Sequence, residues 1–322
     1  MDTNSSLTPG ADLVIETHGL TKRFGGRLAV DGADLRVPRA SAFGFLGPNG
    51  AGKTTLIRML LGLTQPTDGT MRLLGRPVPE QRSQALLRVG AIVEEPRFHS
   101  HLTGRENLSV IAAAREPEAH ARIAPAMARV GLKDRADDRV RTYSLGMRQR
   151  LGVARCLLAD PQLLILDEPM NGLDPAGIQE FREMIASLIG EGRTVFLSSH
   201  LLDEVEKTCD RVAIIDQGHI LMQGPIGDVA AGGRQTVLFG CDDPSLAAGL
   251  LAANAAVEQA VAEPDGVRIV LSAEAGNDPD RALAAINAAL VSAGVAVFRI
   301  EPTRVSLEER FLEMTSRLEV TA

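Results

Sequence analysis

The sequence predicts an α/β fold with four parts: a core built on a phosphate-binding loop, an antiparallel β subdomain, an inserted α-helical subdomain and a small C-terminal α/β domain. Three observations lead to this prediction. A glycine-rich loop at 47–54 lies between an apolar run of strand length and a segment with helical spacing. A continuous apolar run at 163–166, typical of a strand covered on both faces, ends in two carboxylates. Between them, residues 96–160 are rich in Ala, Arg and Glu and have a helical pattern.

Length and charge limit the class of protein. A chain of 322 residues is long enough for more than one domain. Its net charge of -7 disfavours a broad nucleic-acid-binding face, which usually needs a basic excess. No apolar run approaches the length of a membrane span, so we expect any such span to come from another chain. The 3 cysteines are widely spaced, fit no metal motif and are expected to be reduced.

The first part of the chain is expected to be rich in strands. Residues 1–12 are polar and predict a disordered tail. Gly25-Gly26 has the chemistry of a turn within an antiparallel sheet. After the glycine-rich loop, Leu56, Ile57, Leu60 and Leu61 have helical spacing. Strand character is found in five segments before the helical subdomain: 13–15, 35–37, 42–46, 71–74 and 89–93.

Strands and helices alternate after the helical subdomain. An apolar helical stripe runs over 178–189 and ends at Gly190. A strand is predicted at 195–197, and a hairpin around Gln217-Gly218 joins 212–215 to 219–222.

A break near 231–233 separates a second predicted domain. We therefore expect a first domain over 13–232 and a small α/β domain over 233–322. The second domain should contain strands at 236–239, 267–271 and 295–300, helices at about 244–256 and 278–291, and a last helix that starts with a capping box of Ser306 and Glu309. It contains no catalytic constellation, so packing or a dimer contact is its expected role.

The loop at 47–54 fits the pattern G-x-x-x-x-G-K-[ST]. Glycines let the backbone curl so that several N–H groups point at a triphosphate, and the following helix adds the positive end of its dipole. Lys53 can reach the β- and γ-phosphates, and the Thr54 hydroxyl can ligate Mg²⁺. A chance match is disfavoured because a strand precedes the loop and a helix follows it.

Two carboxylates, Asp167 and Glu168, follow the buried strand at 163–166. Asp167 suits binding of Mg²⁺ through water, and Glu168 could orient and deprotonate an attacking water molecule. Adjacent acidic residues at a strand end are often only surface charges. The phosphate-binding loop upstream favours the catalytic interpretation.

At this point the chain resembles the nucleotide-binding subunit of ATP-binding cassette (ABC) transporters over about residues 13–230. Such a cassette has a RecA-like core with an antiparallel β subdomain and an inserted helical subdomain. The resemblance rests on the following motifs in order: Phe24 at the position of an adenine-stacking ring, the loop at 47–54, Tyr143-Ser144-Leu145-Gly146-Met147 for the signature L-S-G-G-Q, the Walker B strand at 163–168, Asn171-Gly172-Leu173-Asp174 for the D-loop, and Ser198-Ser199-His200 for the H-loop.

The resemblance implies a mechanism for these residues. Two subunits would sandwich two ATP molecules head to tail, with Ser144 and Gly146 reaching the γ-phosphate in trans. Glu168 and His200 would be catalytic, and Asp174 would couple the two sites. Thr54 and Asp167, with Glu94 in the Q-loop, would serve Mg²⁺. ATP would be held by Phe24, Gly47, Pro48, Asn49, Gly50, Ala51, Gly52, Lys53, Thr54 and Thr55, and by the partner's signature residues Ser144, Leu145, Gly146 and Met147.

Three positions depart from the family pattern. The signature has Leu145 for Gly and Met147 for Gln, while its hydroxyl and second glycine remain. The Q-loop residue is Glu94, or Glu95 if the register shifts by one, in place of Gln. Phe24 stands for the commoner Tyr and keeps a stacking face. These departures, together with Leu102 to Leu108 and Ser306 to Phe311, resemble the drug, bacitracin and daunorubicin exporter branch.

The function implied by the resemblance is an ATPase that powers a membrane exporter of drugs, antibiotics or lipophilic compounds. Its partners would be a separately encoded transmembrane permease and a second copy of itself, at the cytoplasmic face of the membrane. Import remains open, because the motifs do not encode direction. A non-transport ABC ATPase acting on ribosomes or DNA is an alternative, and a nucleotide-gated module without turnover is another. The single phosphate loop, the net charge and the full catalytic set disfavour these two.

Overall fold

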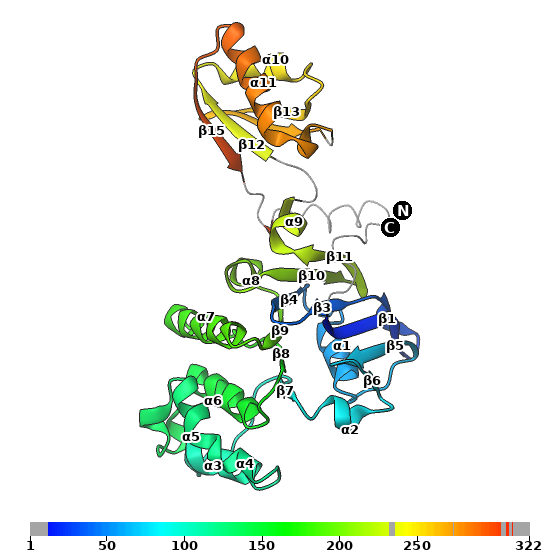
Figure 1. Ribbon diagram of the computed structural model, residues 1–322, viewed down its shortest axis with the longest axis vertical. Coiled ribbons are helices and arrows are strands. Elements are labelled where there is room, and N and C mark those ends of the chain that lie inside the picture. Colours follow the sequence, from blue (N-terminus) through cyan, green and yellow to red (C-terminus); the bar gives the residue numbers. More distant parts are fainter. Residues whose placement is uncertain (1–11, 232–235, 273, 304–306, 309–310, 312–322) are drawn as a thin grey trace. The chain divides into compact units, whose positions relative to one another are not determined.

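The computed structural model describes residues 12–231, 236–272, 274–303, 307–308 and 311 (Figure 1). The chain divides into two compact units, and the division lies between Pro225 and Ile226. The predicted tail, apart from Asp12, and the predicted boundary at 232–233 lie outside the described residues.

A six-stranded sheet is the centre of the first unit. Its order is β11-β10-β4-β9-β8-β7, and all neighbours pair in parallel except β11, which is antiparallel to β10. Every residue of β8 and β9 is buried, which confirms that the sheet is covered on both faces. The strands are β4 (Ala42–Leu46), β7 (Val89–Ile92), β8 (Leu163–Leu166), β9 (Thr194–Ser199), β10 (Arg211–Asp216) and β11 (His219–Pro225).

A second, antiparallel sheet in this unit follows the predicted pattern. Ile15 pairs with Val37 and with Leu73, as expected for the strands read at 13–15, 35–37 and 71–74. The sheet extends further than the sequence indicated, because β2 and β6 were not predicted and β1 is much longer. Its strands are β1 (Leu13–Phe24), β2 (Arg27–Ala33), β3 (Arg36–Pro38), β5 (Asp68–Leu73) and β6 (Arg76–Val78).

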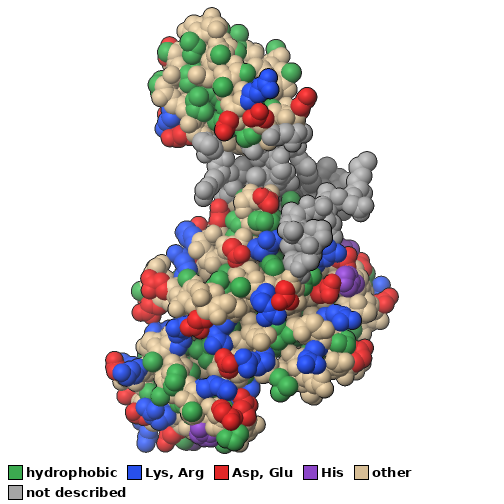
Figure 2. All heavy atoms as spheres, in the orientation of Figure 1, with side chains coloured by type: hydrophobic (Ala, Val, Ile, Leu, Met, Phe, Trp, Pro, Cys, Tyr) green, Lys and Arg blue, Asp and Glu red, His purple; other side chains and the backbone are tan. Residues whose placement is uncertain are grey.

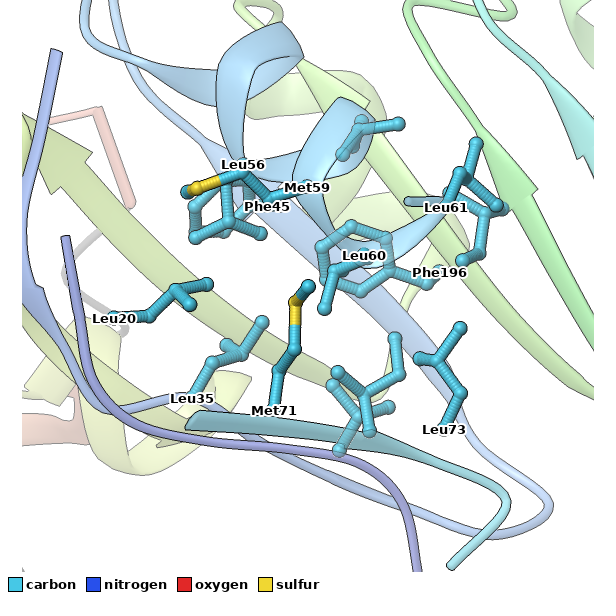
Figure 3. Packing of buried hydrophobic residues seen from close by; sticks show 14 of the residues in the cluster. Leu20, Leu35, Phe45, Leu56, Met59, Leu60, Leu61, Met71, Leu73 and Phe196 are labelled. Carbon is cyan, nitrogen blue, oxygen red and sulfur yellow. The ribbon is translucent and has the colours of Figure 1, made fainter. Parts of the chain in front are cut away.

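The helix α1 (Lys53–Leu60) shares one hydrophobic core with both sheets (Figure 3). Leu56 and Leu60 are fully buried there, beside Phe45 of β4, Phe196 of β9 and Met71 of β5. Burial of each such side chain contributes roughly 1.5–3 kcal/mol to stability. The helix α1 is therefore packed against residues of both sheets.

Helices form most of the segment from Gly104 to Leu157, as predicted, and gather together in Figure 1. Elsewhere in the first unit, α7 (Pro175–Gly190) and α8 (Leu202–Thr208) contact the central sheet. The other helices are α2 (Arg82–Ala85), α3 (Gly104–Ala112), α4 (Glu118–Ala121), α5 (Ile123–Arg129) and α6 (Leu145–Leu157). In the described part of the chain, no helix combines the length and the apolar character needed to cross a membrane.

The second unit is a small α/β fold with its own core. Its sheet has the order β13-β14-β12-β15 and is antiparallel throughout. The core between this sheet and the helices α10 and α11 contains the buried side chains of Phe239, Leu251, Ile269 and Ile286. The elements are α9 (Ile226–Ala231), β12 (Thr236–Cys241), α10 (Pro244–Leu251), β13 (Val257–Glu263), β14 (Gly266–Leu271), α11 (Pro279–Ser292) and β15 (Val297–Thr303). Ser306 and Glu309 of the expected capping box lie outside the described residues.

Candidate active site

The glycine-rich loop joins β4 to α1, and its glycines are required by space as well as by backbone conformation. Gly52 has φ 111°, and a Cβ at this residue would lie 2.3 Å from the carbonyl oxygen of Ala29. A Cβ on Gly47 would lie 2.3 Å from the carbonyl oxygen of Ile215. Any side chain at either position would push the loop away from β2 or β10.

The loop forms one side of a pocket of about 390 Å³. Phe24 is 53% exposed and lies at this pocket, with the Lys22 ammonium 4.9 Å from its ring centroid. An aromatic ring with an open face can stack on a flat heterocycle. The pocket is lined by Phe24, Arg27, Ala29, Pro48, Asn49, Gly50, Gly52, Lys53, Thr54, Thr55 and Glu168.

Lys53 is the buried cation of this site. Its side chain is only 6% exposed, and Nζ donates hydrogen bonds to the carbonyl oxygens of Gly47 at 2.6 Å and Pro48 at 3.2 Å. The same Nζ lies 3.2 Å from Oε1 of Glu168. The loop and the carboxylate therefore hold the ammonium where an anion in the pocket can approach it.

Asp167 and Thr54 supply hard oxygen atoms beside Lys53. The Thr54 hydroxyl donates to Oδ2 of Asp167 at 2.9 Å, and Asp167 is 4% exposed. A hydroxyl and a carboxylate so placed fit Mg²⁺, which binds few protein ligands and completes its shell with water and phosphate oxygens. Among the described residues, no cluster of three or more His, Cys, Asp or Glu could hold a metal by itself.

Glu168 adopts a backbone conformation that is uncommon for a residue with a side chain. Its φ is 47°, in the left-handed region, at a cost of roughly 1–2 kcal/mol. The Glu168 N–H donates to Oγ of Ser198 at 2.9 Å, which helps to hold this turn. The turn directs the carboxylate to Lys53 on one side and to His200 on the other.

His200 follows the end of β9 and pairs with the candidate base. Its Nδ1 lies 2.9 Å from Oε2 of Glu168, and its side chain is 34% exposed. The structure thus brings together five predicted residues, through the contacts of Lys53 and His200 with Glu168 and the contact of Thr54 with Asp167. A carboxylate held between an ammonium and an imidazole, beside an anion pocket, can accept a proton from a water molecule.

The signature residues lie at the start of α6 and are not part of the pocket lining. Ser144 is the N-cap of this helix, and its Oγ accepts a hydrogen bond from the Met147 N–H at 3.2 Å. Leu145 packs on the D-loop, because a Cβ on Gly172 would lie 2.8 Å from its Cδ2. Gly146 remains open, with no atom closer than 3.5 Å to the position of a Cβ. The start of α6 is thus capped by Ser144 and packed on the D-loop through Leu145.

Asp174 and Glu94 also lie outside the pocket lining. Asp174 caps α7, and its Oδ1 accepts from the Gly177 N–H at 3.1 Å, with Pro175 in the first turn. The Glu94 side chain is 61% exposed and forms an ion pair with Arg58 on α1. The predicted roles of Asp174 in coupling and of Glu94 toward Mg²⁺ stay predictions.

The sequence assigned no role of their own to three residues at the site. Arg27 and Ala29 line the pocket from β2, a strand that the sequence did not reveal. Ser198 contacts both Asp167 and Glu168. Its place two residues before His200 was the available signal, although the pattern did not show where its hydroxyl points.

The three cysteines carry free thiols. Burial raises the pKa of the Cys156 thiol to about 11 and also raises the pKa of Cys209 and of Cys241. The thiolate form is therefore scarce at neutral pH, and these residues are poor nucleophiles.

Comparison with known proteins shows which family the chain resembles. Residues 30–171 match the ABC transporter family. An uncharacterized ABC transporter ATP-binding protein of Bacillus subtilis, YhcH, is 40% identical, with 94% of this chain and 96% of the relative covered. The bacitracin transport ATP-binding protein BcrA of Bacillus licheniformis is 39% identical, with 94% and 97% covered. A daunorubicin resistance ATP-binding protein of Streptomyces coeruleorubidus is 36% identical, with 95% and 96% covered.

Solved structures support the same assignment. The cbiO1 protein of Clostridium perfringens, part of the ABC transporter complex cbiONQ, superimposes with a TM-score of 0.62 at 27% identity. The match covers 66% of this chain and 89% of that structure. The predicted cassette fold is therefore confirmed. From its motifs, its fold and its relatives, the chain belongs to the ABC transporter family as an ATP-binding, ATP-hydrolysing protein.

Proposed function

We propose that this chain is the ATPase subunit of a membrane exporter and that it acts as a head-to-tail dimer docked on a permease. The observation that carries the proposal is the contact of Glu168 with both Lys53 and His200 at the edge of the phosphate pocket. This arrangement provides a base beside the position of a terminal phosphate, which a binding module without turnover does not need.

ATP would lie with its adenine against Phe24 and its phosphates on residues 47–54, where backbone N–H groups and the α1 dipole favour the anion. Lys53 would exchange the loop carbonyls for phosphate oxygens. Thr54 and Asp167 would hold Mg²⁺, which neutralises charge on the phosphates when bound. Glu168 would then accept the proton of the attacking water molecule, with His200 fixing its carboxylate.

A second copy would complete each site. The Ser144 hydroxyl and the open Gly146 lie at a helix N-terminus, which suits a γ-phosphate presented by the partner. Leu145 packs on Gly172, so a movement of the signature would also displace the D-loop, which contains Asp174. This contact supports coupling between the two sites of the dimer.

Export of antibiotics or lipophilic compounds is supported by the names of relatives. The aligned proteins include bacitracin transport and daunorubicin resistance ATP-binding proteins, and a Nod factor export protein of Burkholderia lata that is 40% identical over 213 residues. The first two align over almost the whole chain, including the second unit. We place the protein at the cytoplasmic face of the membrane, held there by the permease.

Capture of the partner tests the exporter assignment. A tagged Glu168→Gln variant, loaded with ATP and Mg²⁺, would be purified from detergent-solubilised cells and its partners identified by mass spectrometry. We expect to capture a polytopic membrane protein in stoichiometric amount. This protein should be lost in a Lys53→Ala, Glu168→Gln double variant if nucleotide loading drives assembly. Ribosomal or DNA-associated partners without a membrane protein would favour the non-transport alternative.

We propose that the permease docks near residues 94–107, as the resemblance to the ABC family implies. Arg97 is exposed there, and charge reversal by Arg97→Glu should reduce permease capture. Arg72→Glu on the exposed side of β5 is the matched control and should leave capture unchanged. If the Arg97→Glu variant captures as much permease as the Arg72→Glu control, the docking surface lies elsewhere.

A further inference from the structure

One fully buried hydroxyl links the two acidic residues of the site. Ser198 lies on β9, next to β8, and is 0% exposed. In the parallel register Leu166 pairs with Leu197, so Ser198 stands one step further, beside the point where the chain leaves β8. The pairing of β8 with β9 thus places the Ser198 side chain against Asp167 and Glu168, the first residues after β8.

The Ser198 hydroxyl uses both its donor and its acceptor capacity. It donates to Oδ1 of Asp167 at 2.5 Å and accepts from the backbone N–H of Glu168 at 2.9 Å. A hydroxyl is the smallest side-chain group that can do both, because alanine offers neither function and a thiol is a weak donor and acceptor. Ser198 therefore fixes the Asp167 side chain and the backbone turn at Glu168 at the same time.

Each of these two contacts controls a different functional group. Both oxygens of the Asp167 carboxylate accept hydrogen bonds: Oδ2 accepts from Thr54, and Oδ1 accepts from Ser198. Without the serine, the carboxylate would be free to rotate away from Thr54. The N–H contact secures Glu168 at φ 47°, and this turn brings the Glu168 carboxylate to Lys53 and His200.

We propose that Ser198 is a positioning residue that sets the metal-binding carboxylate of Asp167 and the base carboxylate of Glu168 together. It contacts neither nucleotide nor metal in this role and acts through its two neighbours. The inference rests on the proposed functions of Asp167 and Glu168. It predicts that loss of the hydroxyl changes the Mg²⁺ dependence and the turnover number, while Mg²⁺-free nucleotide binding is spared.

The test compares Ser198→Ala and Ser198→Thr in the full-length protein. For the alanine variant we expect a fall in kcat of roughly 10- to 100-fold, the usual effect of a displacement near 1 Å at reacting groups. The Mg²⁺ concentration that half-saturates nucleotide binding, followed by fluorescence of a labelled ATP, should rise by roughly 10- to 100-fold, the usual effect of losing an outer contact to a metal ligand. Threonine keeps the hydroxyl and should restore both quantities to within about threefold of wild type.

A matched control separates positioning from the general effect of losing a buried hydroxyl. Thr194 lies at the other end of β9, is 0% exposed, and accepts a hydrogen bond from the Ala40 N–H at 2.9 Å. Thr194→Val should lower the urea midpoint without changing the Mg²⁺ dependence. If Ser198→Ala behaves like Thr194→Val in every assay, the proposal is wrong.

Two further measurements keep the test decisive. If the alanine variant does not fold, Ser198→Cys replaces the hydroxyl by a somewhat larger thiol that is a weak donor and acceptor, and turnover in the cysteine variant equal to that of the threonine variant would overturn the proposal. Glu168→Gln is measured in parallel. Unchanged turnover in that variant would remove the proposed base, whereas lost turnover in Glu168→Gln with a normal Ser198→Ala variant would reject only the role of Ser198.

Discussion

Tyr143 and Gly104 show how single residues decide the approach of two segments in the helical subdomain. The Tyr143 hydroxyl is buried and donates to the carbonyl oxygen of Arg135 at 2.6 Å. A Cβ on Gly104 would lie 2.4 Å from this hydroxyl and 3.2 Å from Cε of Met127. The first residue of α3 is therefore a glycine because Tyr143, the first residue of the signature, occupies the space that a side chain would need.

A Gly104→Ala substitution should overpack this contact. We expect a loss of roughly 1–3 kcal/mol in the free energy of unfolding, measured by urea denaturation. Gly190→Ala is the matched control, because no atom lies within 4 Å of the Cβ position at the end of α7. The control should be neutral or slightly stabilising, and an equal loss in both variants would contradict the packing explanation.

Site residues were readable from the sequence where they form a contiguous motif. The loop at 47–54 and the pair Asp167-Glu168 carry their chemistry within a few positions, so spacing alone predicted them. Ser198, Arg27 and Ala29 reach the site from other strands, and their contacts depend on register between strands far apart in sequence. The ion pair of Glu94 with Arg58 was unreadable for the same reason.

At the scale of elements, α3 starts with a complete capping box. The Thr103 hydroxyl accepts from the Glu106 N–H at 3.1 Å, and Oε2 of Glu106 accepts from the Thr103 N–H at 2.7 Å. The hydrogen bonds from Thr103, its backbone N–H first, lower the pKa of Glu106. A lowered pKa means that this contribution is present above the ordinary pKa of glutamate and is lost as pH falls through the pKa of the folded state.

Thr103→Ala should reduce the free energy of unfolding by about 1 kcal/mol at neutral pH, the usual effect of losing an N-cap. In Glu106→Gln the difference from wild type should shrink as the pH falls through the lowered pKa of Glu106 in the folded state, because the wild-type carboxyl then becomes neutral like the amide of glutamine. Urea denaturation at pH 7 and at acid pH measures both effects. A pH-independent difference would show that the carboxylate charge plays no part in the cap.

Buried elements were predicted better than edge elements. The runs at 42–46 and 163–166 and the stripe at 178–189 are apolar because neighbours cover them, and they appear as β4, β8 and α7. β13 escaped prediction because it lies at a sheet edge and its exposed residues interrupt the apolar alternation. β6 is only 3 residues long, too short for a period to be recognised.

At the scale of the whole molecule, charge supports a role away from nucleic acid. The net charge is -7, and on the face shown in Figure 2 Lys and Arg side chains are interspersed with Asp and Glu. A phosphate backbone is bound through an excess of basic groups. The composition of the chain shows no such excess, with 34 Lys and Arg residues against 41 Asp and Glu residues.

The two units have separate hydrophobic cores, so a substitution that destabilises one core should leave the other unit folded. Phe239→Ala removes a fully buried ring from the second core and should destabilise that unit by roughly 3–5 kcal/mol. ATP affinity, measured by calorimetry, should stay within about twofold of wild type because the pocket lies in the first unit. Phe298→Ala, at a ring that is 70% exposed, is the control. A parallel loss of ATP affinity in Phe239→Ala would contradict independence.

The central claim is that Glu168 drives ATP hydrolysis in a nucleotide-closed dimer. The most direct measurement combines turnover and molecular mass for wild type and Glu168→Gln with ATP and Mg²⁺. We predict that the variant still binds ATP, loses roughly 10²- to 10⁴-fold in turnover, and accumulates as a dimer in light scattering. Turnover near the wild-type rate, or a variant that stays monomeric at saturating ATP, would contradict this account.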